Sequence, residues 1–531
     1  MRVFRKPNVY SVPIKSSRED TQNPIYRNIE CISGNKGQLI GAFPQFPTCF
    51  TLRELFDHIV DTYYDFPLFG SAFENNEEVE WVTYSQFKEL VIVLSKELVS
   101  KGISFGASIG VVIENSVWFE LAHWCLAYIG AIFVPIDLSI PTNTANQVLG
   151  YFKCQHLIFS CKTLSFAKEV LENSKPKYLQ SVILACDHEE FDLNLSHING
   201  ENSVFNEYRV FSFSEMISHP SAPSDFQFPP ILSSSLYSYN VGSGRGGALN
   251  GAMLSHSNII AAAASVTSCG ASLAKSVFFS TISNTKPIRR SLELAIMAHG
   301  GSIVFSNRPL QDCLNVFSPS IIAMEPLHMK DLYNIVLFRV MESNWMTRAI
   351  YDFVFSVVSQ SRESNNSIPW VFKTLIVDSF RSLLGSRMKF IISTGYRPDI
   401  HVNHFLRTLL QIPIIQVYGT AETCGIIAMT NIREDSLVHV GGPSVSCEIK
   451  VKTVGTAMSG NEPFPKEILV KGPNVFMGYY RNSSLTSHRI TDEGWFYTGD
   501  LGKISTYGTL EITETKADYE DRMKKYISSP K

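Results

Sequence analysis

The chain has 531 residues, of which 45% are hydrophobic and 18% are charged, with a formal net charge of -3 at pH 7. A chain of this length and composition can bury several cores, so we expect a globular protein of two to four domains. The slightly acidic balance gives no reason to expect nucleic acid as a partner, because such binding depends on clustered Lys and Arg side chains.

The ten cysteines are scattered and include no C-x-x-C pair, which argues against a zinc ribbon and indicates reduced thiols. The basic start, Met1 to Lys15, has no apolar run long enough for a secretory signal. The most apolar segment, Trp118 to Pro135, contains Glu120 and His123 and falls short of the ~20 uninterrupted apolar residues of a membrane span. We therefore expect a cytoplasmic protein. Peripheral association with the cytosolic face of the endoplasmic reticulum or another membrane stays open, as does the oligomeric state.

Residues 1–75 form a predicted N-terminal extension, whose start is rich in Pro, Asn, Gly and Ser and is typical of an extended arm. Thr83 and Gln86 then form a T-x-x-Q capping box, and apolar residues recur at helical spacing up to Gly102. A strand over 109–113, a helix over 116–129 and a strand over 132–136 follow. Such alternation builds a parallel sheet covered by helices, so we place a first α/β subdomain at 76–235.

The same alternation continues through a second α/β subdomain, which we place at 236–430. Its strands and the later strands of the first subdomain are short apolar runs, at 157–159, 182–184, 302–305, 321–323, 390–392 and 414–417. After residue 430 the chain changes to short alternating strands with Gly turns, which predict a small β-barrel over 431–517, followed by a polar tail over 518–531. The predicted fold is α/β, with two doubly wound parallel sheets, helices on both faces of each, and the small β-barrel.

A Gly-rich stretch runs from Val241 to His256 and leads into an Ala-rich helix predicted from Asn258. Glycines let backbone N–H groups approach phosphate oxygens, and a helix start adds a positive dipole, so this segment is a candidate phosphate cradle. A flexible turn is the alternative, because glycine favours turns on its own account.

Two motifs in the last third of the chain carry acidic residues. Tyr418-Gly-Thr-Ala-Glu422 follows a buried strand, where ligands of doubly wound sheets collect, although Glu422 could instead cap the next helix. Gly494-Trp-Phe-Tyr-Thr-Gly-Asp500 lies in the barrel region, where Asp500 could cap a turn.

Taken together, these three segments resemble the adenylate-forming superfamily, whose patterns read T-S-G-T-T-G-x-P-K-G, Y-G-x-T/S-E and G-W-x-x-T-G-D-x-G. The resemblance implies that Asp500 binds the ribose hydroxyls of ATP and that Glu422 holds Mg²⁺. It also implies that Thr420 and Glu422 are catalytic residues and that Tyr418 lines the adenine site. The residues implied to cradle phosphate are Ser243, Gly244, Gly247 and Gly251.

The stretch from Ser318 to Phe390 resembles the long-chain fatty acyl-CoA synthetases of eukaryotic type, including a long helical insertion over 344–385. Ile392-Ser-Thr-Gly395 matches their strand and Gly turn near the acyl-adenylate, which makes Gly395 a candidate substrate contact. The resemblance implies a ligase that takes a long-chain fatty acid, ATP and CoA, and that makes an acyl-adenylate (with AMP as its nucleotide) and then an acyl-CoA.

The chain also departs from the family pattern. Gly242, Arg245 and Gly246 stand at hydroxyl positions of the cradle, and Asn250 stands at its lysine position. Thr515 replaces an Arg that supports the ribose Asp, and the run whose His gates the acyl site aligns with residues 283–286. The tail over 518–531 stands where the family has a C-terminal subdomain with a further Lys. Three interpretations stay open: a ligase of impaired activity, a non-catalytic nucleotide- or acyl-binding protein or scaffold, and a sequence that is part of a longer chain.

Overall fold

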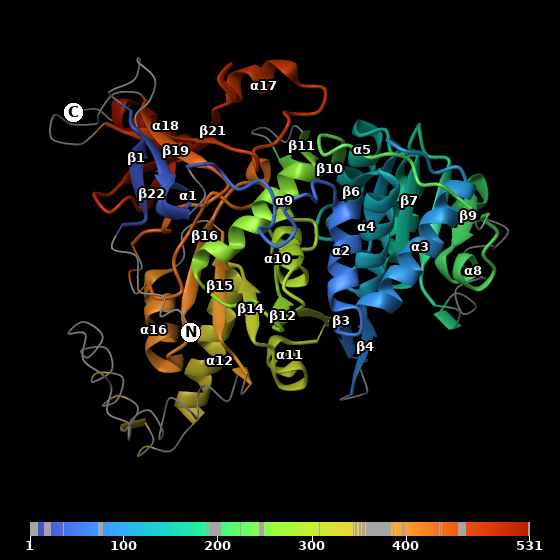
Figure 1. Cartoon of the computed structure of the whole chain (residues 1–531), viewed down its shortest axis with the longest axis horizontal. Helices are drawn as coiled ribbons and strands as arrows, with labels where there is room; N and C mark the ends of the chain where they lie inside the picture. Colours follow the sequence, from blue (N-terminus) through green and yellow to red (C-terminus); the bar gives the residue numbers. More distant parts are fainter. Residues whose placement is uncertain are drawn as a thin grey trace.

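The computed structural model of the chain describes residues 9–14, 23–34, 37–72, 78–187, 189–190, 203–223, 225–243, 249–306, 308–342, 345, 348–349, 352, 356, 384–385, 387–395, 399–434, 436, 438–454 and 464–528. These residues form three sheets with helices around them (Figure 1). In the part of the chain so described, no helix is long and apolar enough to cross a membrane.

The first sheet has seven strands in the order β11-β10-β6-β5-β7-β8-β9. Six of them run parallel, namely β10 (Leu236–Ser243) and the five strands β5 (Ser108–Val112), β6 (Ile132–Pro135), β7 (His156–Ser160), β8 (Ser181–Ala185) and β9 (Arg209–Ser212). At one edge, β10 runs parallel to β6 and pairs antiparallel with β11 (Leu249–Ser255). Strands β5 to β8 are fully buried, as expected where helices cover both faces, whereas the edge strand β9 is partly exposed.

Nine strands form the second sheet, in the order β18-β17-β16-β15-β14-β12-β13-β3-β4. Its centre is parallel and its edges are antiparallel. The strands are β3 (Pro67–Ala72), β4 (Val79–Thr83), β12 (Val277–Ser280), β13 (Ser302–Phe305), β14 (Ile321–Met324), β15 (Phe390–Thr394), β16 (Ile414–Tyr418), β17 (Ala428–Met429) and β18 (Gly442–Pro443).

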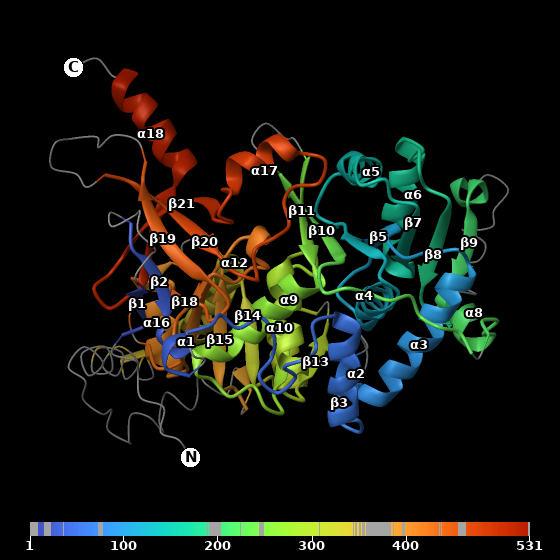
Figure 2. The same ribbon diagram turned by 45° about the horizontal axis from the view of Figure 1, so that its top comes forward.

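Helices lie in layers outside and between these two sheets (Figure 2). The layer between them holds α2 (Leu52–Tyr63), α3 (Tyr84–Ser100), α4 (Val117–Ile129), α9 (His256–Ser265) and α10 (Pro287–Met297). The outer face of the first sheet is covered by α5 (Thr142–Tyr151) and α6 (Leu164–Asn173). The outer face of the second is covered by α11 (Leu310–Phe317), α12 (Pro326–Glu342) and α16 (Ile400–Leu410). Smaller elements include α1 (Ile29–Gly34) and α8 (Phe213–Ser218).

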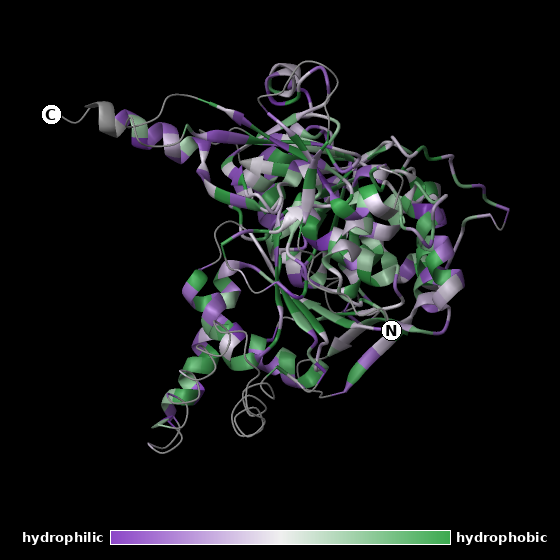
Figure 3. Cartoon of the chain, turned by 60° about the vertical axis from the view of Figure 1, so that its left-hand side comes forward, coloured by the Kyte–Doolittle hydropathy of each residue, from purple (hydrophilic) through white to green (hydrophobic). Residues whose placement is uncertain are grey.

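The third sheet is antiparallel throughout, in the order β1-β2-β19-β20-β21-β22. Its strands are β1 (Ser11–Ile14), β2 (Ile25–Asn28), β19 (Glu448–Thr453), β20 (Lys466–Lys471), β21 (Phe496–Ile504) and β22 (Leu510–Thr515). It joins distant parts of the chain, because β2 pairs with β19. It also curls, so that the backbone N–H of Tyr10 donates to the carbonyl of Tyr507 at 2.9 Å. Beside this sheet lie α17 (Ser483–Arg489) and α18 (Lys516–Ser528), and α18 is mostly hydrophilic (Figure 3).

The predicted α/β fold class is confirmed, and so is the predicted capping box, in which Thr83 and Gln86 bond each other's backbone N–H groups. The sheets, however, do not follow the predicted order along the chain. Strands β3 and β4 belong to the second sheet, whereas β10 and β11 belong to the first. Each of these two sheets thus takes strands from both sides of a predicted domain limit, and the limits themselves stay a prediction. The helical insertion predicted over 344–385 lies, apart from a few residues, outside the described part of the chain.

Two helices, α1 and the longer α2, were missed within the predicted N-terminal extension. The helix α2 begins after Thr51, which forms a capping box with Glu54. Its buried side chains recur at helical spacing: Leu52, Leu55, Phe56, Ile59 and Val60. The same T-x-x-E signal and periodicity are readable in the sequence, so this helix was predictable.

Buried His156 in β7 makes stability depend on pH. Its Nδ1 lies 2.6 Å from the hydroxyl oxygen of Ser181. Burial, together with repulsion from Arg209, lowers the pKa of His156 from its ordinary 6.5 to about 4. Because the folded state holds this imidazole neutral, its stabilising effect is complete above pH 6.5 and is lost as the pH falls toward 4. We expect this group to cost the wild type about 3 kcal/mol of unfolding free energy over that range.

The measurement compares denaturant unfolding of the wild type and of His156→Gln from pH 7 to pH 4. The variant lacks the titrating group, so its stability should fall less steeply over this interval. Parallel profiles for the two proteins would show that His156 is not held neutral.

Candidate functional site

The loop after β16 is a tight turn that carries the first acidic motif. The backbone N–H of Gly425 donates to the carbonyl of Thr420 at 2.8 Å, which folds residues 420–425 back on themselves. Gly419 begins the turn, and a Cβ atom there would lie 2.2 Å from the carbonyl carbon of Gly425. Only glycine fits this contact, because a backbone atom cannot move aside as a flexible side chain can. The turn therefore fixes Thr420 and Glu422 at the carboxyl end of the sheet.

The two acidic motifs meet at a hydrogen bond. The hydroxyl of Tyr418 donates to Oδ2 of Asp500 at 2.7 Å, which joins the end of β16 to the middle of β21. Burial raises the pKa of Asp500 above its ordinary value, and the negative charge of Glu422 adds to this, whereas the Tyr418 bond and Arg489 oppose it. Burial and Asp500 together raise the pKa of Tyr418, which keeps it a hydroxyl donor.

Glu422 lies in the same neighbourhood. Its Oε1 accepts a hydrogen bond of 2.8 Å from the hydroxyl of Tyr479, and its backbone carbonyl accepts one from the N–H of Phe476 at 2.8 Å. Burial and the charge of Glu422 raise the pKa of Tyr479. Because Tyr418 bonds Asp500 and the tight turn directly after β16 carries Glu422, the two carboxylates of the motifs share one region of the protein.

A cavity of about 630 Å³ opens beside this loop. It lies between the carboxyl ends of β6, β14, β15 and β16, the hairpin of β10 and β11, and the start of α10, which is where doubly wound folds bind ligands. Thr420 and Gly395, both predicted as site residues, line it. Most of its wall is apolar, formed by Pro135, Ile136, Ile140, Val148, Val241, Leu249, Pro287, Ile288 and Val417.

The Gly-rich segment has a different local structure from the predicted one. It was predicted as a loop, but it includes the end of β10 and the whole of β11, which pair antiparallel; the predicted helix does follow it, as α9 from His256. Strand pairing explains this, because Val241 pairs with Gly251 and the chain stays extended up to Ser255. The backbone of Ser243 ends β10, whereas Gly244 and Gly247 lie outside the described residues.

Gly251 has a packing role in this hairpin. A Cβ atom there would lie 2.3 Å from the ring of Phe152, which stacks on Tyr239 with ring centroids 4.6 Å apart. Its carbonyl accepts the N–H of Tyr480 at 2.8 Å, so the hairpin is tied to the segment that carries Tyr479. No contact to phosphate is needed to explain a glycine at this position.

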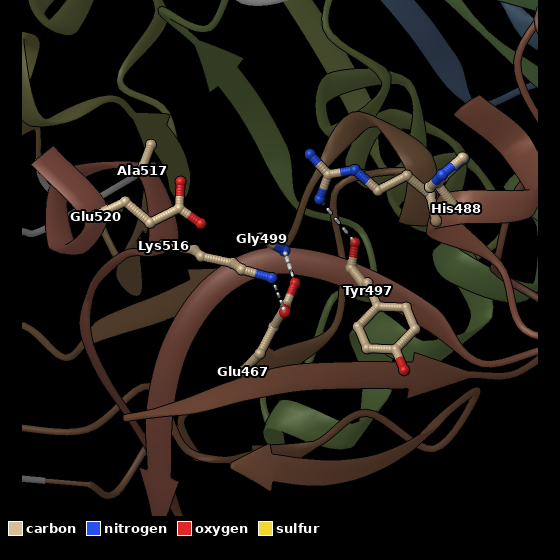
Figure 4. A pocket seen from close by; sticks show the side chains of 8 residues that line it. Glu467, His488, Tyr497, Gly499, Lys516, Ala517 and Glu520 are labelled. Atoms are coloured by element: carbon tan, nitrogen blue, oxygen red, sulfur yellow. Dashed lines mark hydrogen bonds and ion pairs between the residues drawn. The ribbon is translucent and has the colours of Figure 1, made fainter. Parts of the chain in front are cut away.

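A second pocket, of about 480 Å³, lies beside β21 and the start of α18 (Figure 4). Lys516 forms an ion pair with Glu467 at 2.9 Å, and the other oxygen of Glu467 accepts the N–H of Gly499 at 3.2 Å. The register places Thr515 opposite Asp500, at the position where the family pattern has an Arg.

The positive charge near Asp500 comes from Arg489, at the end of α17. Arg489, the last residue of α17, donates from Nη1 to the carbonyl of Tyr497 at 3.2 Å, and the same Nη1 lies 2.9 Å from an ideal Cβ position on Gly499. Its charge lowers the pKa of Asp500, against the effect of burial. Sequence reasoning missed Arg489, because no local pattern indicates that the end of α17 lies beside β21.

A metal ion would find few protein ligands here. Within the described ranges, no group of three or more His, Cys, Asp or Glu side chains is arranged to hold one. Mg²⁺ at nucleotide sites often takes only one or two carboxylates and completes its coordination with phosphate oxygens and water. Glu422 fits that requirement as a single carboxylate, provided that it exchanges its bond to Tyr479.

Comparison with family models identifies the family of this chain. Residues 57–480, more than half of the chain, match the model described as AMP-binding enzyme. The chain belongs to the AMP-binding enzyme family. Its relatives in this family include long chain acyl-CoA synthetase 6, peroxisomal, of Arabidopsis thaliana, at 24% identity over 526 residues, covering 97% of this chain and 72% of that protein. Human long-chain-fatty-acid–CoA ligase 1 is 25% identical over 480 residues, covering 88% of this chain and 67% of that protein.

Solved structures of AMP-binding enzymes share the fold. A long-chain-fatty-acid-CoA ligase of Archaeoglobus fulgidus superposes with a TM-score of 0.66 at 19% identity, covering 88% of this chain and 84% of that one. The adenylation domain of a carboxylate reductase of Mycobacterium chelonae superposes with a TM-score of 0.69 at 16% identity, covering 89% of this chain and 72% of that one. At these identities the likeness shows the adenylate-forming fold.

Proposed function

We propose that this protein is an acid–CoA ligase of the long-chain fatty acyl-CoA synthetase type with weakened turnover. It joins a fatty acid to ATP, which releases pyrophosphate and forms an acyl-adenylate, and the acyl group then passes to the thiol of CoA with release of AMP. One observation carries the proposal: the bond from Tyr418 to Asp500 brings both acidic motifs together beside a largely apolar cavity.

The roles proposed for the site residues follow from their positions. Asp500, a half-buried acceptor, binds the ribose hydroxyls, and Tyr418 orients it by donating to Oδ2. Thr420 lines the cavity wall, and the role proposed for it is contact with the reacting carboxyl and phosphate groups. Glu422 is the carboxylate that would hold Mg²⁺, and the ion supplies charge neutralisation for the phosphates when bound. Gly395 lines the acyl side of the cavity.

Turnover is expected to be weak because the phosphate cradle has lost its lysine and most of its hydroxyl donors. Asn250 stands where the family pattern has a Lys, and the hydroxyl positions carry Gly242, Arg245 and Gly246. Ser243, Gly244 and Gly247 are then left as the proposed phosphate contacts. Loss of one preorganised donor to developing charge commonly lowers a rate by about 10²–10³, and several losses combine without simple addition.

Fatty-acid-dependent exchange of labelled pyrophosphate into ATP tests this proposal. The purified protein, incubated with ATP, Mg²⁺, oleate and labelled pyrophosphate, should form labelled ATP only when oleate is present, at a rate about 10²–10³ below that of an intact family member. No exchange above the rate of a Glu422→Ala, Asp500→Ala double variant would reject adenylation.

The second candidate is a non-catalytic protein that binds nucleotide or an acyl chain. It is favoured by the bonds that occupy both carboxylates, from Tyr418 to Asp500 and from Tyr479 to Glu422, together with the altered cradle. This candidate predicts binding of AMP or of a fatty acid in calorimetry without pyrophosphate exchange.

A further inference from the structure

An ion pair reaches across the wall of the cavity. The Nζ atom of Lys286 contacts Oε1 of Glu325, and both residues line the cavity. Lys286 is the N-cap of α10, whereas Glu325 follows β14 and precedes α12, so the pair joins two separate elements. The two side chains are 49% and 24% exposed, which means that a ligand entering the cavity could reach either group.

The other carboxylate of the cavity is already bonded. Asp137 accepts from the hydroxyls of Ser283 at 2.9 Å and Thr285 at 3.1 Å, and from the N–H of Ser139 at 2.9 Å. Burial acts to raise the pKa of Asp137, but these hydrogen bonds hold it below its ordinary value. The ionised Asp137 therefore has its own donors, and Glu325 is the carboxylate that holds the ammonium of Lys286.

The rest of the cavity wall indicates which kind of ligand could bind the ammonium group of Lys286. Lys286 is the one Lys or Arg among the described residues that line the cavity, and most of the surfaces around it are aliphatic. Aliphatic walls favour a hydrocarbon chain, and a single ammonium favours an anionic head group. A molecule with both features is an aliphatic carboxylate.

We propose that Lys286 binds the carboxylate of the acid substrate and that Glu325 holds this ammonium until the acid arrives. The acid binds by replacing Glu325 as the partner of Lys286, with its chain along the aliphatic wall. The inference rests on the proposed function for the identity of the substrate, and it assigns to that substrate a binding residue on α10. Exposed ion pairs are weak, so the exchange of one carboxylate for another is close to neutral and Glu325 lowers the affinity for the acid only a few-fold.

Calorimetric titration of the whole protein with dodecanoate, and with dodecanol as the uncharged match, tests the assignment without any need for turnover. Lys286→Met should weaken dodecanoate binding about fivefold or more and leave dodecanol unchanged. Glu325→Gln should strengthen dodecanoate binding up to about fivefold, again without effect on dodecanol. In the double variant the gain from Glu325→Gln should vanish, because the ammonium that it releases is gone.

The double variant separates this proposal from simple repulsion by Glu325. If Glu325→Gln strengthens dodecanoate binding equally with and without Lys286, the acid does not use the ammonium and the proposal is wrong. Equal binding of dodecanoate by the wild type and Lys286→Met, or no binding by any variant, also overturns it. A loss of AMP affinity in Lys286→Met, with dodecanoate binding unchanged, would assign the ammonium to a phosphate instead.

A matched control is the ion pair between Lys503 and Glu511 on β21 and β22, at 2.9 Å and with comparable exposure. Glu511→Gln lies outside the cavity lining and should change neither titration. Pyrophosphate exchange is measured separately, so absent exchange with the predicted dodecanoate pattern would reject the ligase and keep the assignment of Lys286.

Discussion

Replacement of Asp500 by Ala should weaken AMP binding about 10- to 150-fold in calorimetry. Asp500 is the half-buried acceptor to which we assign the ribose hydroxyls, and a hydrogen bond to a charged group contributes about 1.5–3 kcal/mol. The variant also leaves the hydroxyl of Tyr418 without the acceptor that it has now, at 2.7 Å.

Two variants make this result specific. Asp492→Ala removes an exposed carboxylate from the segment just before β21 and should leave AMP affinity unchanged. Arg489→Met should weaken AMP binding by a smaller factor than Asp500→Ala, because its charge acts on Asp500 without a direct ion pair to it in the structure. If Asp500→Ala binds AMP as the wild type does, the ribose is not held by this carboxylate.

Replacement of Gly419 by Ala should destabilise the site loop by about 1–3 kcal/mol and abolish nucleotide binding. The added methyl group would lie 2.2 Å from both the carbonyl carbon and the oxygen of Gly425, so the turn that positions Thr420 and Glu422 has to open. Hydrogen exchange measures this directly, because the N–H of Gly425 is protected by its bond to Thr420 and should exchange faster in the variant.

The chain offers a matched glycine in α5. A Cβ atom on Gly150 would meet no atom within 4 Å, so Gly150→Ala should leave nucleotide binding intact and stabilise the protein by about 0.4–1 kcal/mol. An unchanged exchange rate at Gly425 in Gly419→Ala would show that the turn is looser than the structure has it.

Local signals in the sequence predicted local structure well. The capping box of Thr83 and Gln86 and the buried apolar strands are read from neighbouring residues, because a cap and a strand face are set by residues a few positions apart. The helix after the Gly-rich segment was predicted, but the hairpin within it was not, because glycines suit a loop and a hairpin turn alike and only the pairing of β10 with β11 decides between them.

Contacts between distant segments could not be predicted in the same way. The sheet that contains β1 and β2 joins residues about 420 positions apart, through the pairing of Tyr26 with Ile449. Lys286 meets Glu325 across 39 positions, and Arg489 reaches Gly499 from a helix of no special sequence. These placements follow from how the sheets pack. Comparison with the family motifs at residues 283–286 and 515 therefore could show only that the gate His and the ribose-supporting Arg are absent from those positions. It could not show that other side chains, such as Arg489, lie close to the site.

The central claim is that the two acidic motifs and the aliphatic cavity form one site for an activated acid. The most direct test is a crystal structure of the protein with an acyl-sulfamoyl adenosine, a stable analogue of the acyl-adenylate. We predict the ribose against Asp500, the adenine beside Tyr418, and the acyl chain in the cavity lined by Gly395 and Thr420. An analogue bound elsewhere, or one whose acyl chain lies outside this cavity, would contradict the account.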